Sequence, residues 1–286
     1  MKKMSNKNSI TKLNITKLTI TFIYMAFLII LLFPIIIMVN TSLKTYSDVI
    51  SWPPTWFKGN LQWINYYNIT FGDKSILMAL KNSFIVSTSS SLISVVLSIL
   101  AAYSCSRYKI KIQKYFLLII ISTQMFSPVL LVNPMYIIFR NAGILDTLLS
   151  LVIANVATSV PMSVWLLYSY IEVIPIELEE SAWIDGCSRL QGIFHIVAPI
   201  IIPSIITTGL FSFISSWGDL IFSRSFIVSS NLRTVSMVLT DFQSLYKTTW
   251  ETQMAASALS TIPTVIIFII IQKYLIKGMI SSGVKG

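Results

Sequence analysis

The chain has 286 residues, of which 55% are hydrophobic and only 11% are charged. This composition excludes an ordinary soluble domain of this length and is typical of an integral membrane protein. The formal net charge of +10 is spread around the ends of apolar runs, which is the positive-inside pattern and not a nucleic-acid-binding surface. Lipid leaves only helices or closed barrels as spanning backbones, and the long continuous apolar runs predict an all-α membrane protein.

Six apolar runs are long enough to cross a bilayer, which takes roughly 20 residues per helix. We predict spans at residues 18–40, 82–103, 115–132, 148–170, 200–222 and 255–276. The chain then divides into an N-terminal tail of residues 1–17, a transmembrane domain of residues 18–276 and a C-terminal tail of residues 277–286. The first span is too long for a signal-peptide core and lacks a small-residue cleavage pattern before Thr41, so we interpret it as retained.

Basic residues indicate the orientation of the chain. Six spans place both termini on one side, and 13 of the 21 basic residues fall on that side. These are Lys2, Lys3, Lys7, Lys12, Lys17, Arg107, Lys109, Lys111, Lys114, Arg189, Lys273, Lys277 and Lys285. We therefore predict a multi-pass protein of a bacterial-type plasma membrane with both termini in the cytoplasm. Cys105 and Cys187 fall on the same side, where thiols stay reduced, so no disulfide is expected.

Motifs for catalysis and metal binding are missing from the sequence. No G-x-x-x-x-G-K-[ST] phosphate-binding loop occurs, so the chain is not expected to hydrolyse nucleotide by itself. The single histidine, His195, has no Gly-x-Ser-x-Gly elbow to partner it and no cluster of metal-ligating residues around it. We expect no enzyme activity, no bound cofactor and no metal.

Several features inside the spans suggest a moving bundle. Seven of the ten prolines lie within or at the edges of apolar spans, where they kink helices, although static kinks would look the same. The small residues at 255–260 predict close packing of the sixth span against another helix. Asp219, beside Trp217 near the outer end of the fifth span, is a candidate for lining a translocation path, or else a water-accessible interfacial acid. Trp52, Trp56 and Trp63 are read as interfacial anchors or as a docking surface for an external partner.

The segment between the fourth and fifth spans carries a cluster of acids. It reads PIELEESAWIDGCSRLQGIFHIVAP over residues 175–199. Pro175 suits the first position of a helix, and Glu177, Glu179 and Glu180 then occupy the first turns, where the helix dipole favours anions. We therefore predict a short helix that begins at this proline.

The same segment predicts a sharp corner. Leu178, Ser181, Ala182 and Asp185 would share a face of mostly small side chains that lets another surface approach closely. Gly186 would then end the helix as a left-handed cap. The S-x-x-Q sequence from residue 188 predicts a capping box, so a second helix would run from there to residue 199. The unit is a helix, a glycine corner and a helix that project into the cytosol, whereas a simple solvated loop would not need two capped helices.

At this point the sequence resembles the permease subunits of binding-protein-dependent ABC importers, in the carbohydrate-type branch similar to the smaller permease of the maltose system. The motif of that family is E-A-A, three residues, Gly, nine residues and then I-x-L-P. The matching positions, with an acid before the glycine as is common, are Glu180, Ser181, Ala182, Asp185, Gly186, Ile196 and Pro199. Ser181 departs from the first alanine of the motif and Ala198 from its leucine, but both side chains are small, so close approach of another surface is preserved.

The resemblance covers nearly the whole chain. Further matches are SLK at 42–44, NS at 82–83, AAYSCSRY from 101, QMFSPVLLVNPMYIIFRNAGILDT and the ending GMISSGVKG. It implies that the loop at 171–199 couples the chain to ABC ATPase subunits, which use the ATP. It also implies a second permease subunit as a heterodimer partner, an extracytoplasmic solute-binding protein, surrounding membrane lipid, and a sugar or oligosaccharide as the solute.

Two other functions remain open from the residues. A secondary transporter driven by an ion gradient would also use kinked spans and an outer acid, although no inverted pair of broken, charge-bearing helices is apparent. A membrane scaffold or receptor subunit would explain a cytosolic docking unit but not the kinked spans. The dependence of uptake on ATP or on a proton gradient distinguishes the first two functions, and the absence of solute flux would indicate the third.

Overall fold

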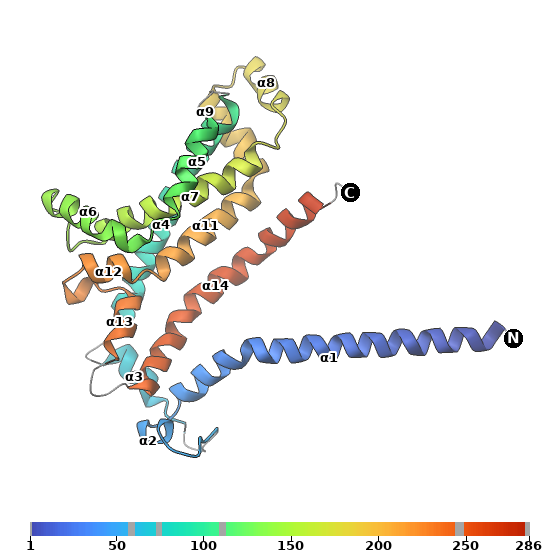
Figure 1. Ribbon diagram of the computed structural model, residues 1–286, viewed down its shortest axis with the longest axis vertical. Helices are drawn as coiled ribbons and strands as arrows, with labels where there is room; N and C mark the ends of the chain where they lie inside the picture. Colours follow the sequence, from blue (N-terminus) through green and yellow to red (C-terminus); the bar gives the residue numbers. More distant parts are fainter. Residues whose placement is uncertain (1, 57–60, 73–75, 109–112, 244–248, 284–286) are drawn as a thin grey trace.

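The computed structural model describes residues 2–56, 61–72, 76–108, 113–243 and 249–283, and within these ranges side chains are described for residues 17–108, 115–243 and 249–274. Nearly all regular structure in these ranges is helical (Figure 1). The helices are α1 (Lys2–Ser42), α2 (Tyr46–Val49), α3 (Ile64–Phe71), α4 (Ile76–Arg107), α5 (Gln113–Thr123), α6 (Pro128–Asn141), α7 (Leu148–Ile171), α8 (Glu177–Ile184), α9 (Arg189–Gly192), the π-helix η1 (Ile193–Val197), α10 (Ala198–Ile200), α11 (Ile202–Trp217), α12 (Ile221–Phe226), the 3₁₀-helix η2 (Ser230–Leu232), α13 (Val235–Asp241) and α14 (Trp250–Gly283).

The number of helices that could cross a membrane agrees with the predicted fold. In the described part of the chain, four stretches are long and apolar enough by length and composition: Lys17–Ser42, Ile76–Arg107, Leu148–Ile171 and Trp250–Tyr274. Two bent helix pairs bring the number to six if each pair counts as one span. The prediction of an all-α protein with about six transmembrane helices is therefore confirmed.

The third predicted span was wrong as a continuous helix, and the fifth begins at a sharp bend. In the third, Tyr115–Thr123 and Pro128–Asn141 meet at 92°. Ser127 is extended, with φ −63° and ψ 137°, because the ring of the following proline disfavours helical backbone in the residue before it. The fifth predicted span, residues 200–222, starts at a bend of 86° between Arg189–Ile200 and Ile202–Trp217. The bend is close to Pro203, which lacks an N–H and crowds the carbonyl one turn earlier. The helix also ends at Trp217, five residues before the predicted boundary.

The remaining predicted spans lie inside longer helices. The first helix already begins at Lys2, so residues 2–17 of the predicted N-terminal tail continue the helix of the first span. At the other end, α14 continues to Gly283, past the predicted boundary at 276, and residues 284–286 of the predicted C-terminal tail lie outside the described residues. α4 likewise exceeds the predicted 82–103 at both ends.

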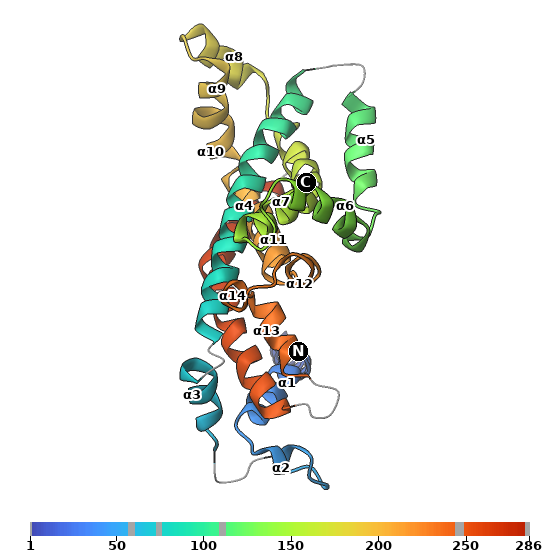
Figure 2. The same ribbon diagram turned by 90° about the vertical axis from the view of Figure 1, so that its left-hand side faces the viewer.

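Three helices, α4, α7 and α11, pack together at the centre of the molecule. The segment with α8 and α9 lies at one end, and α2, α3 and α13 lie at the other (Figures 1 and 2). The C-terminal part of α1 contacts α14, whereas the N-terminal end of α1 lies apart from the bundle (Figure 1). The most apolar stretch of 18 residues within Lys17–Ser42 has no buried residue, so this part of the helix is left for lipid or another subunit to cover.

Small residues bring the central helices close together. Ser90 and Ser98 of α4 are fully buried, and their hydroxyls donate to the carbonyls of Val152 and Val160 of α7, each at 3.4 Å. Helices in lipid associate through such close packing and interhelical hydrogen bonds, since apolar burial alone gives no preference over lipid tails. The small residues that open α14 behave as predicted, because Ala255 and Ala256 are buried against α3, α4 and α13.

Candidate functional site: the corner between α7 and α11

The candidate site is the helix–glycine–helix unit of residues 175–199, called the corner below. Its first helix, α8, begins at Glu177, with the amides of Glu179 and Glu180 donating to the carbonyl of Ile176 at 2.9 and 3.0 Å. The acids occupy the first turn as predicted. Pro175 is not the first helical residue, as the sequence suggested, but precedes the helix by two positions.

Gly186 forms the turn of the corner. Its φ is +93°, in the left-handed region that glycine adopts without a Cβ penalty. Its amide donates to the carbonyl of Trp183 at 3.1 Å, and the amide of Cys187 donates to the carbonyl of Ala182 at 3.0 Å. This pair of bonds is the Schellman motif, which satisfies the last carbonyls of α8. The predicted left-handed cap is therefore confirmed.

The second helix of the corner starts with the predicted capping box. The amide of Gln191 donates to Ser188 Oγ at 3.3 Å, and the amide of Ser188 donates to Gln191 Oε1 at 2.8 Å. From there α9, η1 and α10 continue through Ile196 and Pro199 to the bend before α11. The chain is thus helical over nearly the whole second half of the corner, and Ile196 is half-buried while Pro199 is exposed.

One face of α8 is open to the surroundings. Glu180, Ser181 and Asp185 are exposed on it, and Ile184 has 86% of its surface accessible. Ala182, which the sequence placed on the same outward face, is instead buried. It lies three residues after Glu179, so both side chains project toward the body of the protein.

Glu179 is the residue whose position sequence reasoning missed. The sequence placed its carboxylate only in the first turns of the helix, with no partner named, yet the side chain is fully buried. The Tyr103 hydroxyl donates to Oε2 at 2.6 Å, and Arg107 Nε donates to Oε1 at 2.7 Å. Arg107 also donates through Nη2 to the carbonyl of Ile174 at 2.9 Å. The signal in the sequence is the Tyr–Arg pair at a spacing of four residues in AAYSCSRY, which puts both side chains on one face of α4.

The second arm of the corner also contacts the end of α4. Arg189 Nη1 donates to the Tyr108 hydroxyl at 3.0 Å. Its guanidinium carbon lies 5.2 Å from the centre of the Tyr108 ring and 5.0 Å from that of Trp183, both within the range of cation–π attraction. His195 has a local contact, with Nδ1 3.1 Å from the carbonyl of Gln191, one turn earlier. No group of metal-ligating side chains is found among the described residues.

The second pair of candidate residues lies at the far end of α11 from the corner. Trp217 stacks on Phe213, with ring centres 5.6 Å apart. Asp219 follows α11 and accepts hydrogen bonds from the amides of Phe222 and Ser223, each at 3.1 Å, and from the Ser223 hydroxyl at 3.0 Å. Its carboxylate therefore caps the start of α12. Its role in lining a path stays a prediction.

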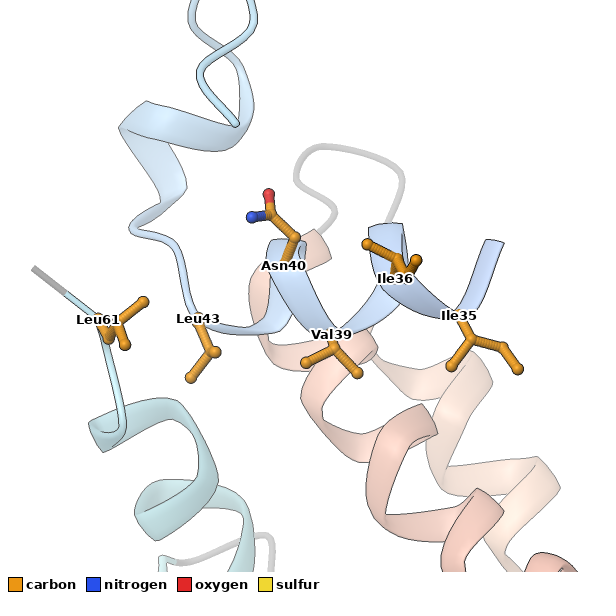
Figure 3. Close-up of a pocket in the computed structure, with 6 residues that line it drawn as sticks. All are labelled: Ile35, Ile36, Val39, Asn40, Leu43 and Leu61. Atoms are coloured by element: carbon orange, nitrogen blue, oxygen red, sulfur yellow. The ribbon is translucent and has the colours of Figure 1, made fainter. Parts of the chain in front are cut away.

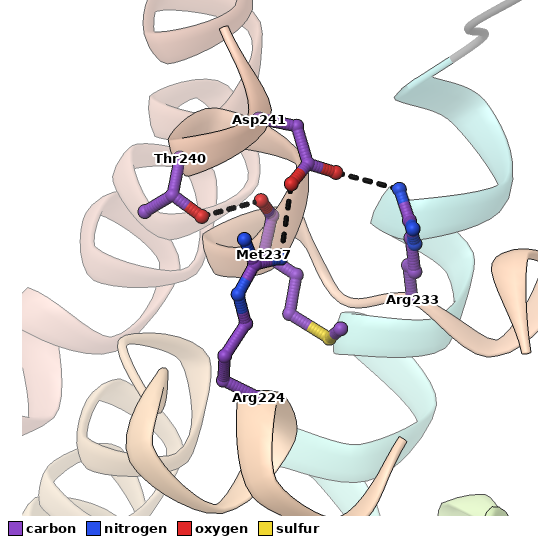
Figure 4. Close-up of polar contacts among 5 residues, drawn as sticks. All are labelled: Arg224, Arg233, Met237, Thr240 and Asp241. Atoms are coloured by element: carbon purple, nitrogen blue, oxygen red, sulfur yellow. Dashed lines mark hydrogen bonds and ion pairs between the residues drawn. The ribbon is translucent and has the colours of Figure 1, made fainter. Parts of the chain in front are cut away.

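An ion-pair cluster lies next to these residues. Arg224 Nη1 contacts Asp241 Oδ1 at 2.9 Å, and Arg233 Nη1 contacts Asp241 Oδ2 at 2.6 Å (Figure 4). Arg224 lies on α12, five positions after Asp219. The structure pairs it with Asp241, on α13, and so connects α12 to α13.

A polar clamp unforeseen from the sequence joins the loop before α7 to the segment after α12. Asp146 Oδ1 accepts the amides of Val228 and Ser229, each at 2.9 Å, and Oδ2 accepts the Ser229 hydroxyl. In return, the amide of Asp146 donates to the carbonyl of Phe226 at 3.0 Å. Four hydrogen bonds thus hold together two segments that are some 80 positions apart in the chain.

An apolar pocket of about 270 Å³ lies at the C-terminal end of α1 (Figure 3). Its lining residues are Ile35, Ile36, Val39, Asn40, Leu43 and Leu61. Recognition of a polar solute needs several convergent polar groups, whereas this lining offers only one amide side chain. The pocket therefore does not qualify as a site for a hydrophilic ligand.

Comparisons with known proteins place this architecture in a family. A family model described as the inner membrane component of binding-protein-dependent transport systems matches residues 94–281. The chain is 32% identical over 255 residues to the sulfoquinovosyl glycerol transport system permease protein SmoH of Agrobacterium fabrum, covering 89% of each chain. It is 33% identical over 260 residues to the trehalose/maltose transport system permease protein MalG of Thermococcus litoralis, covering 90% of this chain and 93% of the relative.

A solved structure shares the fold. With a TM-score of 0.75 and 21% identity, the chain is similar to a chain of a bacterial ABC transporter involved in the import of the acidic polysaccharide alginate, covering 91% of this chain and 96% of that one. The resemblance deduced from the corner and the other motifs is therefore confirmed. The chain belongs to the family of inner membrane components of binding-protein-dependent transport systems, and it is a transport subunit and not an enzyme.

Proposed function

We propose that this chain is one of two permease subunits of an ATP-driven importer, and that its corner docks onto a separate ATPase subunit. The observation that carries the proposal is the corner itself. It is built on a Schellman glycine and a capping box, and it exposes Glu180, Ser181 and Asp185 next to Gly186 in the spacing of the family motif. Such a rigid, exposed projection fits a cleft in a partner protein.

The proposed solute is a sugar or oligosaccharide. The relatives named above are permeases of transport systems for sulfoquinovosyl glycerol and for trehalose and maltose. The similar solved structure is that of a transporter involved in the import of a polysaccharide. We propose that Trp217 and Asp219 contribute to the path, because an indole face suits the apolar face of a sugar ring and a carboxylate accepts from its hydroxyls. A heterologous second permease would complete that path, and a solute-binding protein outside the membrane would deliver the solute.

Transport in this proposal is a two-state process. ATP binding would close the ATPase pair and draw the corners together, which favours the outward-facing bundle, and hydrolysis would restore the inward-facing one. Ala182, Ile196 and Pro199 would set how α8 and the helix leading to α11 are held. The chain would bind no cofactor, because the ATP is used by the partner ATPase.

The energy source provides the test of this function. We expect the purified chain alone to hydrolyse no ATP. Proteoliposomes that also contain the second permease, the ATPase and the solute-binding protein should take up sugar only when ATP is present on the side of the membrane that carries the ATPase. Proton uncouplers should have no effect on this uptake. Uptake that survives ATP depletion but stops with an uncoupler would identify an ion-gradient-driven transporter instead.

The orientation of the chain is a separate prediction. With both termini and the corner in the cytoplasm, native Cys187 should react with an impermeant thiol reagent in inverted vesicles and not in intact cells. A cysteine in place of the exposed Ser47, in the segment between α1 and α3, should show the reverse. Replacing Cys105 by serine removes the other native thiol. Labelling of both positions from the same side would contradict the six-span topology.

A further inference from the structure

One motif of the sequence has no role in the function proposed so far: the AAYSCSRY stretch at the C-terminal end of α4. Three of its side chains hold both arms of the corner. Tyr103 and Arg107 bind Glu179 of α8 at 2.6 and 2.7 Å, and Tyr108 binds Arg189 of α9 at 3.0 Å. The contacts on the α8 side are buried, because the side chain of Glu179 is 0% exposed and that of Arg107 is 7% exposed.

A buried ion pair is a poor source of net stability, because the cost of removing two charges from water offsets most of their attraction. It does fix geometry, since neither partner can move away without leaving an unpaired charge. Arg107 in addition holds the carbonyl of Ile174, just before the corner. Two contacts therefore fasten the first arm of the corner to α4: one through the side chain of Glu179 and one through the backbone carbonyl of Ile174, directly before the corner.

The other end of α4 is fastened equally specifically. Asn82 Nδ2 donates to the carbonyls of Asn231 and Arg233 at 2.9 and 3.0 Å, and the amide of Val235 donates to Ser83 Oγ at 2.9 Å. These contacts hold the segment that leads from η2 into α13, next to the ion pairs of Asp241. α4 thus joins the corner to the segment at the opposite end of the bundle (Figure 1).

The helix between these two ends is suited to transmit movement. Its 32 residues contain neither proline nor glycine, and at 1.5 Å per residue they span about 48 Å. The other helices that contain the long spans, α1, α7 and α14, each have an internal proline. Prolines are the commonest sites of kinks, so α4 is the long helix least able to bend.

We infer that Arg107 and Glu179, supported by Tyr103, Tyr108 and Arg189, are positioning residues that clamp the corner to α4, and that α4 carries the movement of the corner to the segment at residues 231–235. This inference rests on the proposed coupling role of the corner. It adds the element that connects ATPase docking to the far side of the bundle.

The test uses the double variant Arg107→Met with Glu179→Leu in the complete transporter. Both charges are removed together, so no unpaired buried charge remains and the chain is expected to fold and reach the membrane at the parent level. The ATPase should still co-purify, because the exposed face of α8 is unchanged. Uptake per assembled complex, and ATP hydrolysis stimulated by solute-loaded binding protein, should each fall about tenfold, within the range of coupling between distant sites.

The matched control is Ser104→Ala. Ser104 lies on the same end of α4, between Tyr103 and Arg107, but its side chain is exposed and its hydroxyl donates to the carbonyl of Leu100 within α4, at 2.9 Å. It should transport like the parent. A second variant, Asn82→Ala, removes the fastening at the far end of α4 and should lower stimulated hydrolysis and uptake in the same way as the double variant.

Two results would overturn the clamp. One is parental uptake per complex in the double variant. The other is a loss of membrane abundance with unchanged uptake and stimulation per complex, which would assign the pair a structural role alone. The reference is Gly186→Val, which alters the corner itself: if that variant also transports like the parent, the coupling role of the corner is wrong, whereas a defect there beside a normal double variant contradicts only the clamp.

Discussion

Replacing Gly186 by valine is expected to abolish most transport while leaving the protein in the membrane at near-parental levels. The φ of +93° is strained for any residue with a Cβ, and for a β-branched side chain the cost is of order 1–3 kcal/mol. A Cβ at this position would meet no atom within 4 Å, so the effect comes from the backbone and not from a clash. Relief of the strain would turn the second arm away from its docking angle, while the membrane-spanning helices stay intact.

The measurements are membrane abundance, co-purification of the ATPase and solute uptake. A matched control exists at Gly143, which has a φ of +69° and free space around the position of a Cβ. It forms the same Schellman bonds: its amide donates to the carbonyl of Arg140, and the amide of Ile144 donates to the carbonyl of Phe139. Gly143→Val carries a similar strain at a different helix end, so it should retain ATPase association. Equal loss of association in the two glycine variants would show that strain alone, and not the corner, is responsible.

Two further changes in the corner are expected to weaken ATPase association to different degrees. Glu180→Lys reverses a charge on the exposed face of α8 and should weaken ATPase association about as much as the glycine variant. Gln191→Ala removes half of the capping box, a contribution of roughly 0.5–2 kcal/mol, and should be milder. If Gly186→Val and Glu180→Lys both transport like the parent, the corner is an ordinary loop.

Replacing Asp146 by alanine is expected to give the largest loss of stability of any single change outside the membrane-spanning segments. The carboxylate accepts three hydrogen bonds from Val228 and Ser229, and the residue itself has a φ of 56°. Alanine loses the acceptors and is strained in the left-handed region, while aspartate and asparagine tolerate it. Together these effects should lower the free energy of unfolding by about 2–4 kcal/mol, after allowance for the partial exposure of the site.

Asp146→Asn is the control for this change. Asparagine keeps an acceptor and the tolerance for positive φ but loses the charge, so it should cost about 1 kcal/mol. The midpoint of thermal unfolding of the chain in detergent provides the comparison among parent, Asn and Ala variants. Equal midpoints for parent and Ala variants would mean that the loop before α7 does not depend on this clamp.

The same clamp predicts a dependence on pH. The hydrogen bonds from the Ser229 hydroxyl and from the amides of Ser229 and Val228 lower the pKa of Asp146 below its ordinary value of 3.8. A carboxyl whose pKa is lower in the folded state contributes stability that is complete above the unfolded pKa and is lost as the pH falls through the folded pKa. The advantage of the parent over Asp146→Asn should therefore be constant near neutral pH and should shrink below about pH 4. An advantage that is unchanged in acid would contradict the role of the charge.

The amino-acid sequence by itself determined the features of this protein that depend on near neighbours in the chain. Apolar run length predicted the transmembrane helices, and the left-handed cap at Gly186 and the capping box at Ser188 were confirmed where they were expected. Each of these features involves residues within about five positions of one another, or a composition that lipid requires, so the physical rule can be applied without knowing the fold.

Only the tertiary structure decided which side chains of the same type take different roles. Glu179 and Glu180 are adjacent acids in one helix turn, yet the first is buried on Arg107 and the second is exposed. Asp146 binds the segment at 228–229, and Asn82 binds the segment at 231–233, across separations of 82 to 151 positions. The bends of about 90° at the third and fifth spans also depend on packing, because proline permits a change of direction without fixing it. Burial, ion pairing and helix direction result from contacts between segments that are distant in the chain. A local pattern in the sequence does not indicate which distant segment will pack against it.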